Sequence, residues 1–196
     1  MRRESLARIA GCLVLMTLPL GACDESVAPT VAPEAPEVPQ PPAPGSAFVH
    51  TVETDVSGYY LPVTEITVGP YRLDHIFLGQ GSEFEAWERG DRSETFAPVM
   101  LSFDDTASPM VQTELGEARS VTVRVLPTAY SVSDDTVRFA GTSEELGSVS
   151  LALRLDPDAL ATARRNLGDE APVLSGRVTI GGRTFGDTRF RWYGGD

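Results

Sequence analysis

The segment Val149-Ser150-Leu151-Ala152-Leu153-Arg154-Leu155 decides the fold class, because large apolar residues occupy every second position in it. Successive side chains of a β-strand point to opposite faces, so these apolar residues share one face, and small or charged residues share the other. This alternation predicts a strand with one face on a core. Residues 121–125 repeat the pattern. Residues 71–78 become apolar on both faces towards their end, which predicts a more central strand.

One helix is predicted directly after this strand, near residues 157–167. Asp156 suits the N-cap, Pro157 suits the first helical position, and Gly168 marks the end. Spacings of three and four place an apolar stripe on one side of this helix, formed by Leu160, Ala163 and Leu167. The helix then leads to a final hairpin made by residues 176–180 and 183–192.

Turn residues separate the other apolar runs at short intervals. Gly69-Pro70, residues 133–136 and Gly181-Gly182 predict hairpin turns. Arg89-Gly90-Asp91 predicts a further turn, between strands at 84–87 and 96–103. Short antiparallel strands with one short helix make the fold mainly β, either an antiparallel β-sandwich or a partly open β-barrel.

This β-rich region, residues 47–196, has the length of a single globular domain. A domain of about 150 residues buries close to 70% of its unfolded surface, which suffices for a core without disulfides. The region contains no cysteine and no lysine. We expect it to be a monomer.

The N-terminus has the organisation of a signal peptide. Residues 1–8 are basic, and residues 9–20 are apolar over a length of roughly 18 Å as a helix, which is shorter than a membrane core of about 30 Å. The next residues, Leu20-Gly21-Ala22-Cys23, resemble the lipobox of bacterial lipoproteins.

The lipobox resemblance implies cleavage between Ala22 and Cys23, so that the signal 1–22 leaves. Cys23 then carries diacylglycerol and an amide-linked acyl chain such as palmitate, and two or more chains anchor a protein stably to a membrane. The alternative is an ordinary secretory signal that leaves Cys23 as a free thiol. With a lipid anchor, the domain belongs to the bacterial cell envelope, in the periplasm or at the surface. Asp24 resembles an inner-membrane retention signal, but the choice between inner and outer membrane stays open.

Residues 23–46 join the lipidated cysteine to the domain through a proline-rich linker. Prolines recur every one to four residues between 29 and 44, so the segment favours extended polyproline II without tertiary structure. At about 3.1 Å per residue, some twenty residues span up to roughly 60 Å. A spacer is the preferred interpretation, and a docking motif for an aromatic groove is the alternative.

The net charge of −12 disfavours nucleic acid and anionic membrane surfaces as partners. Few residues suggest chemistry. His50 and His75 are far apart, and Asp74 is expected to point to the opposite face of the strand from His75. No metal site and no cofactor site is predicted.

A dense carboxylate group occupies the predicted hairpin: Glu83, Glu85, Glu88, Asp91 and Glu94. Such a group predicts a solvated acidic hairpin, with a calcium site as the alternative. Aromatic residues concentrate in the first half of the domain. If Trp87 or the Tyr59-Tyr60 pair were exposed beside that hairpin, they would form a recognition patch.

These features predict a membrane-tethered envelope lipoprotein whose β domain binds or braces another macromolecule, without catalysis. The partner is expected to be an envelope protein or cell-wall material. Two alternatives stay open: an anchored hydrolase of cell-wall or polysaccharide material that uses the 83–94 carboxylates, and a β domain that binds a small ligand.

Overall fold

The computed structural model describes residues 48–114 and 116–195. Cys23, the predicted signal peptide and the predicted proline-rich linker lie outside these residues. Among the described helices, none has the length and hydropathy needed to span a membrane. The β-strands are β1 Phe48–Thr51, β2 Gly58–Pro62, β3 Thr67–Val68, β4 Tyr71–Leu78, β5 Val99–Asp105, β6 Met110–Thr113, β7 Gly116–Arg119, β8 Thr122–Val125, β9 Pro127–Ser133, β10 Thr136–Ser143, β11 Gly147–Leu155, β12 Pro172–Ile180 and β13 Arg183–Tyr193; the helices are α1 Gly81–Glu88 and α2 Pro157–Arg165.

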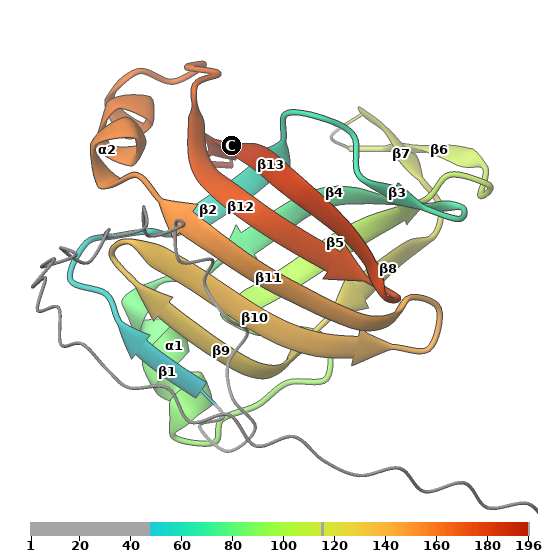
Figure 1. Ribbon diagram of the computed structural model, residues 1–196. Coiled ribbons are helices and arrows are strands. Elements are labelled where there is room, and N and C mark those ends of the chain that lie inside the picture. Colours follow the sequence, from blue (N-terminus) through green and yellow to red (C-terminus); the bar gives the residue numbers. More distant parts are fainter. Residues whose placement is uncertain (1–47, 115, 196) are drawn as a thin grey trace, which may run out of the picture. The chain divides into compact units, whose positions relative to one another are not determined.

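The domain is mainly β, as predicted, and one large curled sheet forms a half-barrel (Figure 1). Its strand order is β1-β9-β10-β11-β12-β13-β2-β4-β5-β8, with β3 paired to β4. Neighbouring strands are antiparallel except β1 and β9, which are parallel. The hairpin of β6 and β7 forms a separate two-stranded sheet.

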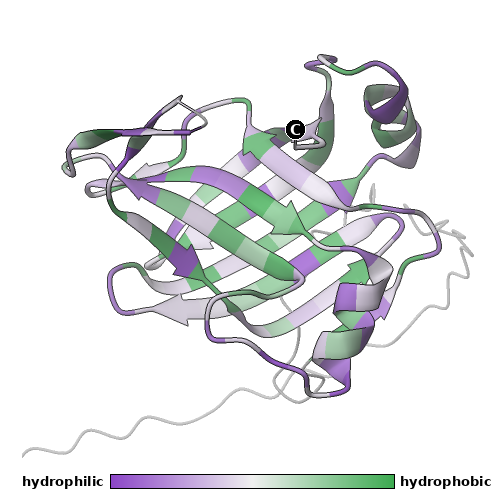
Figure 2. Ribbon diagram, turned by 180° about the vertical axis from the view of Figure 1, so that it is seen from behind, coloured by the Kyte–Doolittle hydropathy of each residue, from purple (hydrophilic) through white to green (hydrophobic). Residues whose placement is uncertain are grey.

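The inward side of the curled sheet carries the core. The alternation predicted from the 149–155 segment is confirmed, since Val149, Leu151, Leu153 and Leu155 are buried on β11. Figure 2 shows apolar and polar residues alternating along strands of the sheet. Tyr60, Phe103, Phe139 and Phe190 are fully buried and fill the space inside the curl. The half-barrel is therefore packed with side chains.

Tight backbone contacts accompany this packing. Gly176 on β12 has a φ of 151°, and a Cβ there would lie 2.3 Å from the Ala152 carbonyl oxygen of β11. No side chain fits so close to a neighbouring backbone, so glycine is required where β11 and β12 approach each other.

The predicted turns at Gly69-Pro70, 133–136 and Gly181-Gly182 all join paired strands. The predicted helix is present as α2, and the Asp156 carboxylate accepts a hydrogen bond of 2.9 Å from the Ala159 amide as its N-cap. The stripe is shorter than predicted: Leu160 and Ala163 are buried, but Leu167 lies beyond the helix and is 80% exposed.

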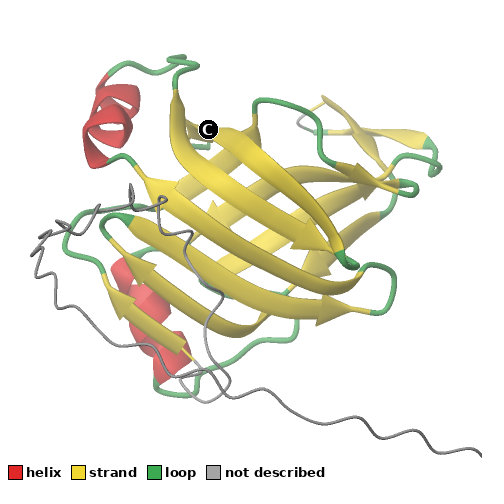
Figure 3. Ribbon diagram, viewed as in Figure 1, coloured by secondary structure: helices red, strands yellow, loops and turns green. Residues whose placement is uncertain are grey.

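The predicted strand at 84–87 and its hairpin are wrong, because these residues belong to helix α1 (Figure 3). Glu83 accepts a hydrogen bond of 2.7 Å from the Gln80 amide and completes a capping box. Phe84 and Trp87 are the buried residues of this helix. Phe84 contacts Tyr130 of β9, and Trp87 contacts Phe48 of β1, so α1 packs on the inward side of these two strands.

Candidate functional site

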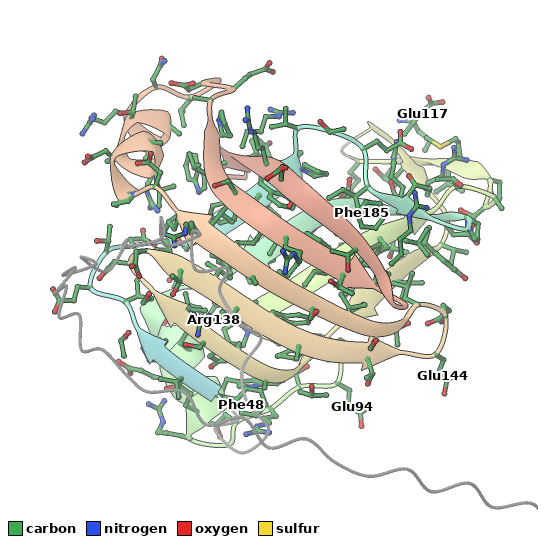
Figure 4. All side chains as sticks on the ribbon, viewed as in Figure 1. Phe48, Glu94, Glu117, Arg138, Glu144 and Phe185 are labelled. Carbon is green, nitrogen blue, oxygen red and sulfur yellow. The ribbon has the colours of Figure 1, made fainter. Side chains whose placement is uncertain are left out.

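The carboxylates predicted to share a hairpin are separated by the helix. Glu83 caps α1, while Glu85 is exposed and forms a weak ion pair of 3.5 Å with Arg89. Glu94 lies in the loop after α1, at the lower edge of the molecule in Figure 4. Within the described ranges, no three histidine or acidic side chains converge as metal ligands. The described part of the chain therefore shows no calcium site among these carboxylates.

Glu88 is instead the centre of a polar cluster that is partly open to solvent. Both of its carboxylate oxygens lie 2.9 Å from His50 Nδ1, and the Tyr130 hydroxyl donates to Oε1 over 3.1 Å. Burial and the negative charge of Glu88 raise the pKa of the Tyr130 hydroxyl. The cluster joins α1 to β1 and β9, so it helps to hold the first described strand in the domain.

Aromatic rings surround this junction. The Phe48 ring lies 6.0 Å from Trp87 and 5.2 Å from Tyr130, and the Arg92 guanidinium lies 4.3 Å above Phe48. Trp87 is only 5% exposed. A recognition patch would require Trp87 to be exposed, so this residue does not belong to one and instead packs within the fold.

Asp74 and His75 are closer than predicted. His75 Nδ1 lies 2.7 Å from Asp74 Oδ2, although adjacent residues of a regular strand point apart. The pairing of β4 with β5 shifts register between Leu73 and His75, and such a bulge turns neighbouring side chains towards each other. The hydrogen bond from His75 lowers the pKa of the Asp74 carboxyl.

This pair does not extend to a nucleophile. Ser102 is the cross-strand partner of His75, but no hydrogen bond joins these two described residues, and Ser102 is only 8% exposed. A serine hydrolase needs its serine hydroxyl bonded to the histidine and open to substrate. The His75 and Tyr59 rings instead pack edge to face, at a centroid distance of 5.0 Å.

Tyr59 belongs to a row of large side chains on the outward side of the sheet. Strand pairing places Tyr193 of β13 opposite Tyr59 of β2, Tyr59 opposite Phe77 of β4, and Phe77 opposite Met100 of β5. Phe96 adds a further ring, 5.6 Å from Phe77. We call these residues the aromatic surface: Tyr59, Phe77, Phe96, Met100 and Tyr193. Tyr193 is 42% exposed, and the other four are partly exposed.

The aromatic surface lies on the opposite side of the sheet from the core. Tyr60, the next residue after Tyr59, is fully buried and donates a hydrogen bond of 2.6 Å to the Val56 carbonyl. The predicted Tyr59-Tyr60 pair is thus divided between the two sides of β2. Outward strand positions usually carry polar residues, so a row of aromatic and apolar side chains is unusual on this side of the sheet.

A shallow groove of about 270 Å³ continues from this surface along β2, β4 and β13. Its lining is amphipathic, with two cations and two carboxylates beside apolar side chains: Leu61, Pro62, Glu65, Arg72, Leu73, Asp74 and Arg191. Arg72 forms a 2.8 Å ion pair with Asp104. The groove therefore offers charge and hydrogen-bonding groups next to the aromatic surface.

A second hollow, of about 410 Å³, lies between residues 52–56 and the start of α1. Asp134 anchors its wall by accepting hydrogen bonds from the Glu53 and Thr54 amides at 3.2 and 2.8 Å. Burial opposes ionisation of Asp55, but hydrogen bonds from Ser57 and Arg164 outweigh it and lower the pKa of that carboxyl. A general acid needs a raised pKa, so Asp55 is unsuited to that role.

Comparison with protein-family models, with curated proteins and with solved structures finds no match to this chain.

Proposed function

We propose that this chain is a membrane-tethered envelope lipoprotein whose β domain binds another protein through the aromatic surface, without catalysis of its own. The tether rests on the sequence 20–23, which resembles a lipobox and assigns lipid attachment to Cys23. The linker from 24 to 46 then separates the domain from the bilayer. The bound partner is an envelope component within reach of that linker.

The observation that carries the binding role is the row from Tyr193 through Tyr59 and Phe77 to Met100. Tyrosine, phenylalanine and methionine are enriched at protein interfaces, where they bury much apolar area at a low cost in side-chain entropy. The core is already filled from the inward side of the sheet, so packing of this domain does not account for an outward row.

Ring orientation favours a protein partner over a polysaccharide. Adjacent rings are tilted by 55° between Tyr59 and Phe77, by 44° between Tyr59 and Tyr193, and by 64° between Phe77 and Phe96. A sugar chain stacks best on rings that present their faces in one plane. Tilted rings present edges and faces in alternation, and these fit apolar side chains and aromatic edges of another protein.

Photo-crosslinking in the native envelope tests this proposal. A photoreactive residue in place of Tyr193 is expected to capture one discrete partner from cells that express the full chain. Met110 on β6 is the matched control, since it is 49% exposed but lies outside the aromatic surface. Equal capture from both positions, or none from Tyr193, contradicts the binding role. In the same cells, Cys23→Ser is expected to release the protein from the membrane fraction.

A further inference from the structure

The outward side of β10, β11, β12 and β13 differs in charge from the rest of this acidic chain. Outward positions alternate with the buried ones, and on β10, β11 and β12 they carry three cations: Arg138, Arg154 and Arg177. Serine, threonine and alanine fill the other outward positions of these strands, at Thr136, Ala140, Thr142, Ser148, Ser150, Ala152, Ser175 and Thr179. These eleven positions include no acidic residue.

Strand register arranges the cations in a zigzag. Arg138 and Arg177 flank Ala152 in one row across the sheet, while Arg154 and Arg189 flank Ser175 in the next. We call Arg138, Arg154, Arg177 and Arg189 the arginine array. Neighbouring strands are about 4.8 Å apart, and successive outward residues of one strand are about 6.8 Å apart. Array members on neighbouring strands are therefore separated by roughly 8 Å at their Cα atoms.

One carboxylate, Asp187, lies beside the array, because the residues around it in β13 pair with Gly176 and Val178, the neighbours of Arg177. Glu144 lies at the β10–β11 turn, at the far end of the sheet from Arg138 in Figure 4. Within residues 48–114 and 116–195, none of Arg138, Arg177 and Arg189 forms an ion pair. Charges beyond about 10 Å are largely screened at physiological salt, so the four cations of the array outweigh the one adjacent carboxylate, Asp187, and the local potential is positive despite the net charge of −12.

We propose that the arginine array binds a linear polyanion, a polymer with phosphate or carboxylate groups at intervals close to the spacing of the array. Guanidinium groups form paired hydrogen bonds with both kinds of anion, and the intervening hydroxyls add donors. Of the small residues between the cations, Ala152 is covered, whereas Ser175 between Arg154 and Arg189 is exposed and lets a chain approach the sheet. This inference does not depend on the aromatic surface or on the lipid anchor.

Three other occupants fit the surface less well: another protein, a bilayer and a single-stranded nucleic acid. The array contains no large apolar side chain, so it lacks the buried anchors of a stable protein interface and the groups that insert into a bilayer. It also contains no aromatic ring on which bases could stack, as single-stranded nucleic acids require. Charge and hydrogen bonding alone recognise a polyanion without bases.

The test measures binding of the domain from Ser46 onward to sodium polyphosphate and to polygalacturonate, by calorimetry at several salt concentrations. The two polymers distinguish phosphate from carboxylate recognition. Binding of at least one is expected, with an affinity that falls steeply with salt. The double variant Arg154→Ser/Arg177→Ser is expected to weaken it by about tenfold or more. Arg138 is left intact because its Nε is buried without a hydrogen-bond partner.

The matched control is Arg89→Ser/Arg124→Ser, which removes the same charge from exposed positions at the C-cap of α1 and in β8. Equal weakening by both double variants would show a general charge effect and would overturn the proposal. Failure of the unaltered domain to bind either polymer would also overturn it. Binding restricted to phosphatidylglycerol vesicles, or tighter binding to single-stranded DNA than to polyphosphate, would assign the array to one of the other occupants.

Discussion

Replacing Glu88 with alanine tests whether the polar cluster holds β1 and α1 together. The change removes the acceptor for His50 Nδ1 at 2.9 Å and for the Tyr130 hydroxyl at 3.1 Å. A hydrogen bond to a charged group contributes about 1.5–3 kcal/mol when buried. The His50 and Glu88 side chains keep 17% and 25% of their exposure, which reduces this contribution. We therefore expect the free energy of unfolding to fall by about 2 kcal/mol.

Glu85→Ala is the matched control, because it places the same residue in the same helix. The side chains of Glu85 and Arg89 are both 62% exposed, so their ion pair is weak, and the expected change lies within about 0.5 kcal/mol. Urea unfolding of the domain from Ser46 onward, followed by circular dichroism, measures both variants. The reasoning is refuted if Glu88→Ala destabilises the domain no more than Glu85→Ala does.

Three further predictions concern the core, the sheet and the outward side. Leu153→Asp buries an unpaired carboxylate in the middle of β11 and is expected to unfold the domain at neutral pH, as loss of the β-sheet spectrum would show. Gly176→Ala is expected to lower the free energy of unfolding by about 2 kcal/mol or more, because the added Cβ meets the Ala152 carbonyl. Gly186 has open space around it, so Gly186→Ala is expected to change the same free energy by less than about 1 kcal/mol in the same urea assay. The pKa of Asp74 is lowered in the folded state, so its hydrogen bond to His75 stabilises the fold above the unfolded pKa of about 3.8 and loses this effect as pH falls through the folded pKa. The stability difference between the unaltered domain and Asp74→Asn is therefore expected to shrink as the pH falls through the folded pKa of Asp74; a difference that persists unchanged at pH 3 would contradict this assignment.

The predicted strands and turns hold where one local pattern decides the structure. β11 alternates without interruption, and α2 has an N-cap, a first-turn proline and a C-terminal glycine in sequence. Helix α1 was missed because it is short and buries only Phe84 and Trp87. Their spacing of three residues forms no long apolar stripe. The useful signal was Gln80 followed three positions later by Glu83, which is the spacing of a capping box.

Local sequence patterns do not predict the aromatic surface and the arginine array, for a different reason. Tyr59, Phe77 and Tyr193 are far apart in the chain, and they align only through the register of β2, β4 and β13. Register depends on turns and bulges along the whole sheet, so sequence spacing does not reveal which outward residues become neighbours. The bulge that brings Asp74 to His75 is another such case.

The tether is the central claim, because the location of the domain and the partners within its reach follow from it. Mass spectrometry of the mature protein, extracted from its native envelope and treated with a thiol-alkylating reagent, tests it directly. The expected chain begins at Cys23 and carries the added mass of a diacylglyceryl group, with or without an amide-linked acyl chain, and no alkylation. A chain that begins at Cys23 with an alkylated, unlipidated thiol would instead identify an ordinary secretory signal and contradict the tether.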